Sequence, residues 1–102
     1  MKIWLDDIRQ APLGYTHTKS VNETKEVIIK AEQEGVAIEL LDLDHDLGDF
    51  YYDGGDGIKL LDYLAENEKY YPIRLHTMNM VGKRNMLRMI DRYWPKENEY
   101  ER

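Results

Sequence analysis

Three short stretches of the sequence carry acidic, imidazole or amide side chains directly after an apolar run. They contain Asp6, Asp7 and Arg9; Asp44, His45 and Asp46; and His76, Thr77 and Asn79. Carboxylates bind hard divalent cations, imidazoles exchange protons near neutral pH, and a guanidinium binds phosphate oxygens. If the three stretches meet in the fold, they provide the groups that phosphodiester cleavage requires.

The four carboxylates of these stretches, Asp6, Asp7, Asp44 and Asp46, need a positive partner if they lie close together. Like charges raise one another's pKa, so the carboxylates cannot all stay ionised without compensation. A divalent cation such as Mg²⁺ or Mn²⁺ is one solution, with Asp6, Asp7 and Asp44 as its predicted ligands. Arg9 and Lys83 offer another. The simpler alternative for any single Asp is that it faces water at the end of a strand.

His45 and His76 follow two different predicted strands. One imidazole can accept a proton while the other donates one, and Asp44 and Asp46 can orient the rings. We therefore predict these four residues as catalytic. A lone histidine at a strand end is more often an ordinary polar residue, and His17 is assigned to that class.

The polar residues after the third stretch supply the predicted substrate contacts. The hydroxyl of Thr77 and the amide of Asn79 can hold phosphate oxygens, as can Arg9. Lys83 and Arg84 lie near the start of the last predicted helix, where they are close enough to meet a phosphate. Arg84, Arg88 and Arg92 recur every four residues, which most often indicates a solvated basic helix face.

The elements that must position these residues alternate between strand and helix. Strands are predicted at 2–5, 38–43 and 73–76, and helices at 20–34, 56–67 and 82–94. An edge strand is predicted at 15–19, with its direction left open because its connection to the first strand is short. The order indicates an α/β fold with a mostly parallel sheet of about four strands and helices on both faces. Parallel strands direct their carboxyl ends to one edge, where such folds bind ligands.

Composition limits the class of protein. The 102 residues are expected to form one domain over 1–95 with a charged tail at 96–102. The absence of Cys excludes disulfides and thiolate chemistry and favours a reducing, cytoplasmic location, and no apolar run is long enough for a membrane helix. The net charge of −6 disfavours binding of DNA or RNA by a global positive field, although local basic patches remain possible. The oligomeric state is left open.

Residues 2–9, 43–48 and 74–84 resemble the cyclic-phosphate processing receiver-like domains, a minimal offshoot of the receiver superfamily. The resemblance covers nearly the whole chain, and Leu-Asp-His-Asp-Leu-Gly at 43–48 is its most specific segment. It implies a receiver-type (flavodoxin-like) three-layer sandwich and a hydrolase acting on a cyclic phosphate, either a 2′,3′-cyclic RNA end or a cyclic nucleotide. It also implies an acidic centre of Asp6, Asp7, Asp44 and Asp46, an acid–base pair of His45 and His76, and a phosphate clamp of Arg9, Thr77 and Asn79.

Two alternative functions are compatible with the same residues. A signalling receiver would bind Mg²⁺ through Asp6 and Asp7, accept a phosphoryl group on Asp44, and use Thr77 as its switch hydroxyl. The sequence lacks a fifth strand with the expected Lys, lacks the helix usual between the first two strands, and places His45 directly after the acceptor position. A nucleotide-binding module without catalysis is the other alternative. The phosphodiesterase remains the favoured prediction.

Overall fold

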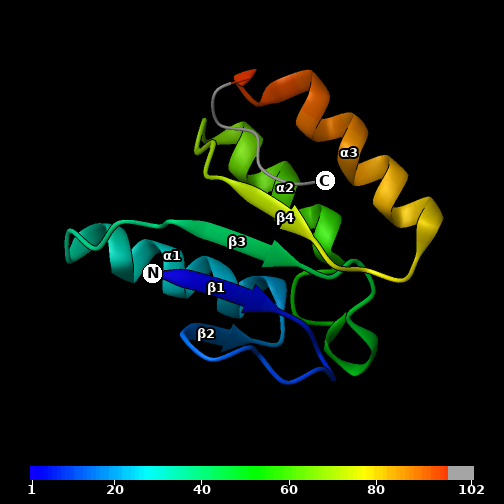
Figure 1. The fold of residues 1–102 in the computed structure, drawn as a ribbon, viewed down its shortest axis with the longest axis horizontal. Coiled ribbons are helices and arrows are strands. Elements are labelled where there is room, and N and C mark those ends of the chain that lie inside the picture. The colour runs from blue at the N-terminus through cyan, green and yellow to red at the C-terminus, as the bar shows by residue number, and fades with distance from the viewer. Residues whose placement is uncertain (97–102) are drawn as a thin grey trace.

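The computed structural model describes residues 1–96, which form a four-stranded sheet and three α-helices (Figure 1). The strands are β1 (Lys2–Leu5), β2 (Tyr15–Thr18), β3 (Leu40–Leu43) and β4 (Ile73–Leu75). The helices are α1 (Val21–Gln33), α2 (Gly57–Glu66) and α3 (Met80–Tyr93), with a short 3₁₀ helix, η1, at Gly48–Phe50. The predicted α/β fold is confirmed.

All neighbouring strands pair in parallel, in the order β2-β1-β3-β4. The edge strand β2, whose direction the sequence left open, runs parallel to β1 although only residues 6–14 connect the two. Every strand therefore ends at the same edge of the sheet. The three polar stretches follow β1, β3 and β4 at that edge.

One face of the sheet carries the hydrophobic core. In register, Ile3 of β1 lies beside Leu41 of β3, which lies beside Ile73 of β4, and all three belong to a single buried cluster. The same cluster includes side chains from each helix, such as Ile28, Leu64 and Ile90. All three described helices thus pack on one face, which corrects the expectation of helices on both.

The direction of the connections explains this arrangement. From β2 to β3 and from β3 to β4 the chain moves the same way across the sheet, and right-handed crossovers place both connecting helices on the same face. Only the connection from β1 to β2 moves the opposite way. Residues 6–14 are too short, and with Pro12 and Gly14 too turn-rich, to form a helix there.

The helix boundaries follow local capping. Ser20 is the N-cap of α1, and its Oγ accepts a hydrogen bond from the Glu23 amide at 3.0 Å. The last helix begins at Met80, two residues earlier than predicted, because Asn79 caps it and accepts from the Gly82 amide at 2.9 Å. None of the described helices is both long and apolar enough to cross a membrane.

The long connection between β3 and α2 is fixed to the N-terminus of α1. The Ser20 hydroxyl donates to the Asp53 carboxylate at 2.6 Å, and the Asn22 amide donates to the Asp53 carbonyl at 3.1 Å. The Gly57 amide, at the start of α2, donates to the His45 carbonyl at 2.7 Å. These bonds hold the acidic connection at the carboxyl edge of the sheet.

Candidate active site

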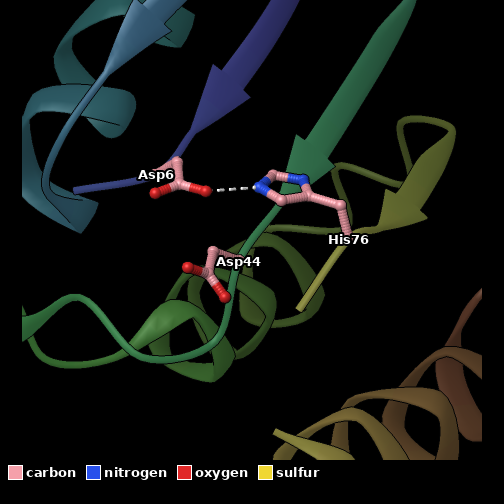
Figure 2. Close-up of side chains that lie close together, drawn as sticks. All are labelled: Asp6, Asp44 and His76. Carbon is pink, nitrogen blue, oxygen red and sulfur yellow. Dashed lines mark hydrogen bonds and ion pairs between the residues drawn. The ribbon is translucent and has the colours of Figure 1, made fainter. Parts of the chain in front are cut away.

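Asp6, Asp44 and His76 converge at the carboxyl edge of the sheet (Figure 2). They follow β1, β3 and β4, and one ligand atom of each lies within 4.8 Å of the others. His76 Nε2 is 3.0 Å from Asp6 Oδ2. We call these three residues the central cluster. Its two carboxylates are almost fully buried, with exposures of 1% and 6%.

Asp6 is an ionised carboxylate whose oxygens are well supplied with donors. Its Oδ1 accepts from the amides of Ile8 and Arg9 at 2.9 and 2.8 Å, while Oδ2 faces His76. Burial acts to raise the pKa of Asp6, but the amides of Arg9 and Ile8 and the His76 ring together lower it below the ordinary value. Asp6 is therefore a fixed negative charge at the centre of the site.

The positively charged guanidinium of Arg9 lies beside this cluster. Its Nε lies 3.6 Å from Asp6 Oδ2, and its Nη1 donates to the His76 carbonyl at 2.9 Å. The side chain is 44% exposed, so the guanidinium also faces solvent. Arg9 is placed where it can meet an anion that approaches the cluster.

The His76 ring is held on three sides. Nδ1 lies 2.7 Å from Oδ1 of Asp42, and Nε2 faces Asp6. The ring stacks on the indole of Trp4, with centroids 3.7 Å apart and planes inclined by 4°. The Trp4 indole is itself fixed, because Nε1 donates to the Arg9 carbonyl at 3.1 Å. His76 thus has one defined orientation.

Asp7 points to the other side of the acidic centre, against Gly48. Gly48 has φ +49°, and a Cβ there would lie 2.4 Å from Asp7 Oδ2, so only glycine fits. Burial raises the pKa of Asp7, and the charges of Asp6, Asp44 and Asp49 raise it further. Asp7 is the carboxylate that most needs a positive partner.

His45 belongs to a second, neighbouring cluster with Asp46 and Asn79. His45 Nδ1 lies 2.7 Å from Asp46 Oδ1, which also accepts from the Asn79 amide nitrogen at 3.0 Å. The hydrogen bonds from His45 and Asn79 hold the pKa of Asp46 below its usual range. The His45 ring packs on Gly82 of α3, where a Cβ would lie 2.5 Å from His45 Cγ. Asp56 completes a possible ligand group with His45 and Asp46.

The two histidines therefore do not share one contact group. Their clusters are joined through Asp44, whose Oδ1 accepts from the His45 amide at 2.8 Å. Over residues 1–96, no contact joins the two imidazole rings directly. A substrate that spans both rings would have to bridge the Asp44 carboxylate.

The remaining predicted residues lie at the start of α3. Thr77 is buried, and its Oγ1 accepts from the Asn79 amide at 3.1 Å. The Asn79 side chain is engaged by both Asp46 and the α3 cap. Lys83 and Arg84 lie in the first two turns of α3, and neither side chain has a hydrogen bond or ion pair to the two clusters within residues 1–96.

Several residues of the site were missed from the sequence. Asp42 and Trp4 orient His76, Asp49 adds charge near Asp7, and Asp56 binds the Leu47 amide at 3.1 Å. Asp42 carried a signal, because it is the one charged residue of the buried strand Leu40–Leu43. Trp4 carried none that distinguishes it from a core aromatic residue.

The donor set of the acidic centre suits a hard divalent cation. Asp6 already has four donor groups around its oxygens, which leaves Asp44 as the carboxylate of the central cluster with more capacity to ligate an ion. Asp7 lies near enough for the Asp44 charge to raise its pKa, and a cation would offset that repulsion. The residues present therefore fit Mg²⁺ or Mn²⁺.

Comparison with protein families gives a match over most of the chain. The family model described as "Cyclic-phosphate processing Receiver domain" matches residues 1–92. No curated protein and no solved structure matches the chain. The matched range contains both clusters, all four strands and nearly all of α3.

Proposed function

Because this chain belongs to the cyclic-phosphate processing receiver domain family, we propose that it is a phosphodiesterase that opens a cyclic phosphate on a nucleotide or an RNA end. The observation that carries the proposal is the convergence of Asp6, Asp44 and His76 at the carboxyl edge of the sheet. Arg9 lies over the same cluster with its guanidinium partly open to solvent. An imidazole can transfer protons during the reaction, and a guanidinium can stabilise the negative charge that develops on the phosphate oxygens. The carboxylates beside them can orient these groups.

In the proposed reaction a water oxygen bonds to phosphorus and one ring P–O bond breaks. A base takes a proton from the water, and an acid gives a proton to the departing alkoxide, so the product is a phosphomonoester with a free hydroxyl. His76 Nε2 and the ring of His45 are the groups proposed to exchange these protons. Arg9 is proposed to bind the non-bridging oxygens, which gain charge as water attacks.

A divalent ion is part of the proposal but no step depends on its geometry. Asp7 and Asp44 are its proposed ligands, with water completing the shell of Mg²⁺ or Mn²⁺. When bound, the ion would neutralise charge on the phosphate and act as a Lewis acid. The proposed substrate contacts still include Thr77, Asn79, Lys83 and Arg84. Asn79 would first have to break its hydrogen bonds with Asp46 and with the Gly82 amide.

The test is turnover of 2′,3′-cyclic nucleotides and of short RNA with a 2′,3′-cyclic end, each with EDTA, Mg²⁺ or Mn²⁺. We expect product with one of the metals, and a loss of at least about 100-fold in His76→Ala and His45→Ala, the scale of general acid–base catalysis. Asp62→Asn, on the exposed side of α2, is the control that should keep full activity. Wild-type protein that binds these substrates without product would instead indicate a binding module.

The signalling receiver remains the second candidate, because Asp44 follows β3 within reach of Asp6 and near Asp7. Exposure to acetyl phosphate with Mg²⁺, followed by intact mass measurement, separates the two functions. An adduct of one phosphoryl group that Asp44→Asn abolishes would favour the receiver. Over residues 1–96 the sheet has only four strands, so the described chain offers no fifth-strand Lys to such a mechanism.

A further inference from the structure

Asp42 is a buried carboxylate that has no role among the residues proposed to contact substrate. It lies in the middle of β3, where all four residues are buried, and it is only 2% exposed. Burying an ionised carboxylate is costly unless a close partner compensates. Its side chain lies on the sheet face away from the hydrophobic core, in register with Trp4 on one side and Arg74 on the other.

The partner that the structure provides is the imidazole of His76. The contact between Asp42 Oδ1 and His76 Nδ1 is 2.7 Å long, within the range of a charge-assisted hydrogen bond. An ionised carboxylate can only accept, so Nδ1 must carry the proton in this contact. Nε2 lies 3.0 Å from the ionised Asp6 carboxylate, so for the same reason it donates to Asp6, and the ring bridges the two carboxylates.

Trp4 completes this support by closing one face of the ring. The parallel stack at 3.7 Å opposes rotation of the imidazole about its bond to Cβ, which would break both carboxylate contacts. The backbone of His76 is also fixed, because its amide donates to the Leu43 carbonyl at 3.0 Å and its carbonyl accepts from Arg9. The ring is therefore held in position before any substrate binds.

We infer that Asp42 and Trp4 are positioning residues that keep a proton on His76 Nδ1 and direct Nε2 to the Asp6 side of the cluster, where the phosphate is proposed to bind. This inference rests on the proposed phosphodiesterase function for its catalytic consequence, but the proton on Nδ1 can be measured without turnover. Neither residue touches the site where the phosphate would bind. Their effect is on the direction of the ring and on the proton held at Nδ1.

The experiment compares wild type, Asp42→Asn and Trp4→Leu by kinetics and by ¹⁵N NMR of the histidine rings at a fixed pH. Asp42→Asn keeps the shape of the side chain but replaces one acceptor oxygen by a donor NH₂. We expect it to lower kcat about 10–100-fold with KM changed less than about threefold, the scale seen when the partner that orients a histidine is removed. The His76 Nδ1–H signal should be present in wild type and lost or exchanging in Asp42→Asn.

Trp4→Leu keeps Asp42 and tests the stack separately. We expect the Nδ1–H signal to persist, the ring to become mobile, and kcat to fall by a smaller factor than in Asp42→Asn. Asp62→Asn is the matched control for charge removal and should change neither readout. Thermal unfolding of each variant shows whether it is folded.

The outcomes separate this inference from the proposed function. If wild type turns over no cyclic phosphate but the Nδ1–H signal depends on Asp42, the proposed function fails and the positioning role stands. If a folded Asp42→Asn protein keeps the wild-type kcat and Nδ1–H signal, the inference is wrong. A loss of activity that merely follows a loss of folded protein, with an unchanged Nδ1–H signal in the folded fraction, would also overturn it.

Discussion

Asp7 is the residue whose ionisation the fold opposes most clearly. Its carboxylate is packed against Gly48 and faces the charges of Asp6, Asp44 and Asp49, so its pKa is raised by burial and then by repulsion. A carboxyl group whose pKa is higher in the folded state than in the unfolded state lowers the free energy of unfolding once it ionises. Removing this charge should therefore stabilise the protein at neutral pH and weaken any cation site.

We predict that Asp7→Asn raises the melting temperature at pH 7 by a few degrees in EDTA. The gain should be absent at a pH below the ordinary carboxyl range, and should grow as pH rises through the raised pKa of Asp7. Mg²⁺ should raise the melting temperature of wild type but not of Asp7→Asn, because only the former keeps the proposed ligand. Calorimetry from pH 3 to 8 measures both effects, and equal stability of the two proteins at pH 7 in EDTA would contradict the prediction.

The residues of the central cluster illustrate what a sequence can and cannot show. Asp6, Asp44 and His76 follow three apolar runs, and parallel strands must bring such positions to one edge. The separation of His45 from His76 was not foreseeable, because it depends on the direction of side chains in the turn after β3. A charge within the apolar strand Leu40–Leu43 marked Asp42 as unusual, but its contact with His76 depends on which sheet face the helices leave uncovered, and the strand alone does not contain that information.

At the scale of elements, the sequence predicted order and type well and spatial arrangement less well. Caps and periodicity identified all three helices and all four strands, since those signals are local. The placement of every described helix on one face depends on the direction of each crossover across the sheet, which is a non-local property. The start of α3 at Met80 depended on Asn79 acting as its cap rather than as a free polar side chain.

At Gly82, where α3 contacts His45, helix propensity and packing predict opposite effects of an alanine substitution on stability. Gly82 lies inside α3, where alanine would ordinarily stabilise a helix by about 0.5–1 kcal/mol. A Cβ at Gly82 would instead lie 2.5–2.8 Å from three atoms of the His45 ring. We predict that Gly82→Ala destabilises the protein by about 1–2 kcal/mol, because the steric clash with His45 destabilises the fold more than the higher helix propensity of alanine stabilises it.

Urea unfolding of Gly82→Ala measures this free energy, and, under the proposed function, turnover of a cyclic phosphate reports the displacement of His45. The matched control is Asn85→Ala, on the exposed side of the same helix, which should not move His45. An increase in stability on Gly82→Ala would show that α3 can shift away from His45 without cost.

At the scale of the whole molecule, charge favours a small substrate over a long one. The chain carries 20 acidic and 14 basic residues, and seven Asp lie in the connections that surround the site: Asp6, Asp7, Asp44, Asp46, Asp49, Asp53 and Asp56. Polynucleotide binding gains from neutralising successive phosphates with Lys and Arg, and its strength falls as salt rises. Here the field around the site has the opposite sign, so an RNA strand beyond its terminal nucleotide should be repelled.

If the proposed phosphodiesterase function holds, a 2′,3′-cyclic mononucleotide should be a better substrate than a decanucleotide with the same cyclic end. We predict a kcat/KM ratio of about tenfold or more in favour of the mononucleotide at 0.01 M ionic strength, where screening extends about 30 Å. The ratio should shrink towards one at 1 M, where the screening length is about 3 Å, because repulsion from the outer phosphates disappears. Steady-state kinetics across this salt series makes the test, with the mononucleotide as internal control for salt effects on catalysis itself. A decanucleotide preferred at low salt would instead point to a basic path for the strand, and Arg84, Arg88 and Arg92, exposed along α3, would be the residues to replace.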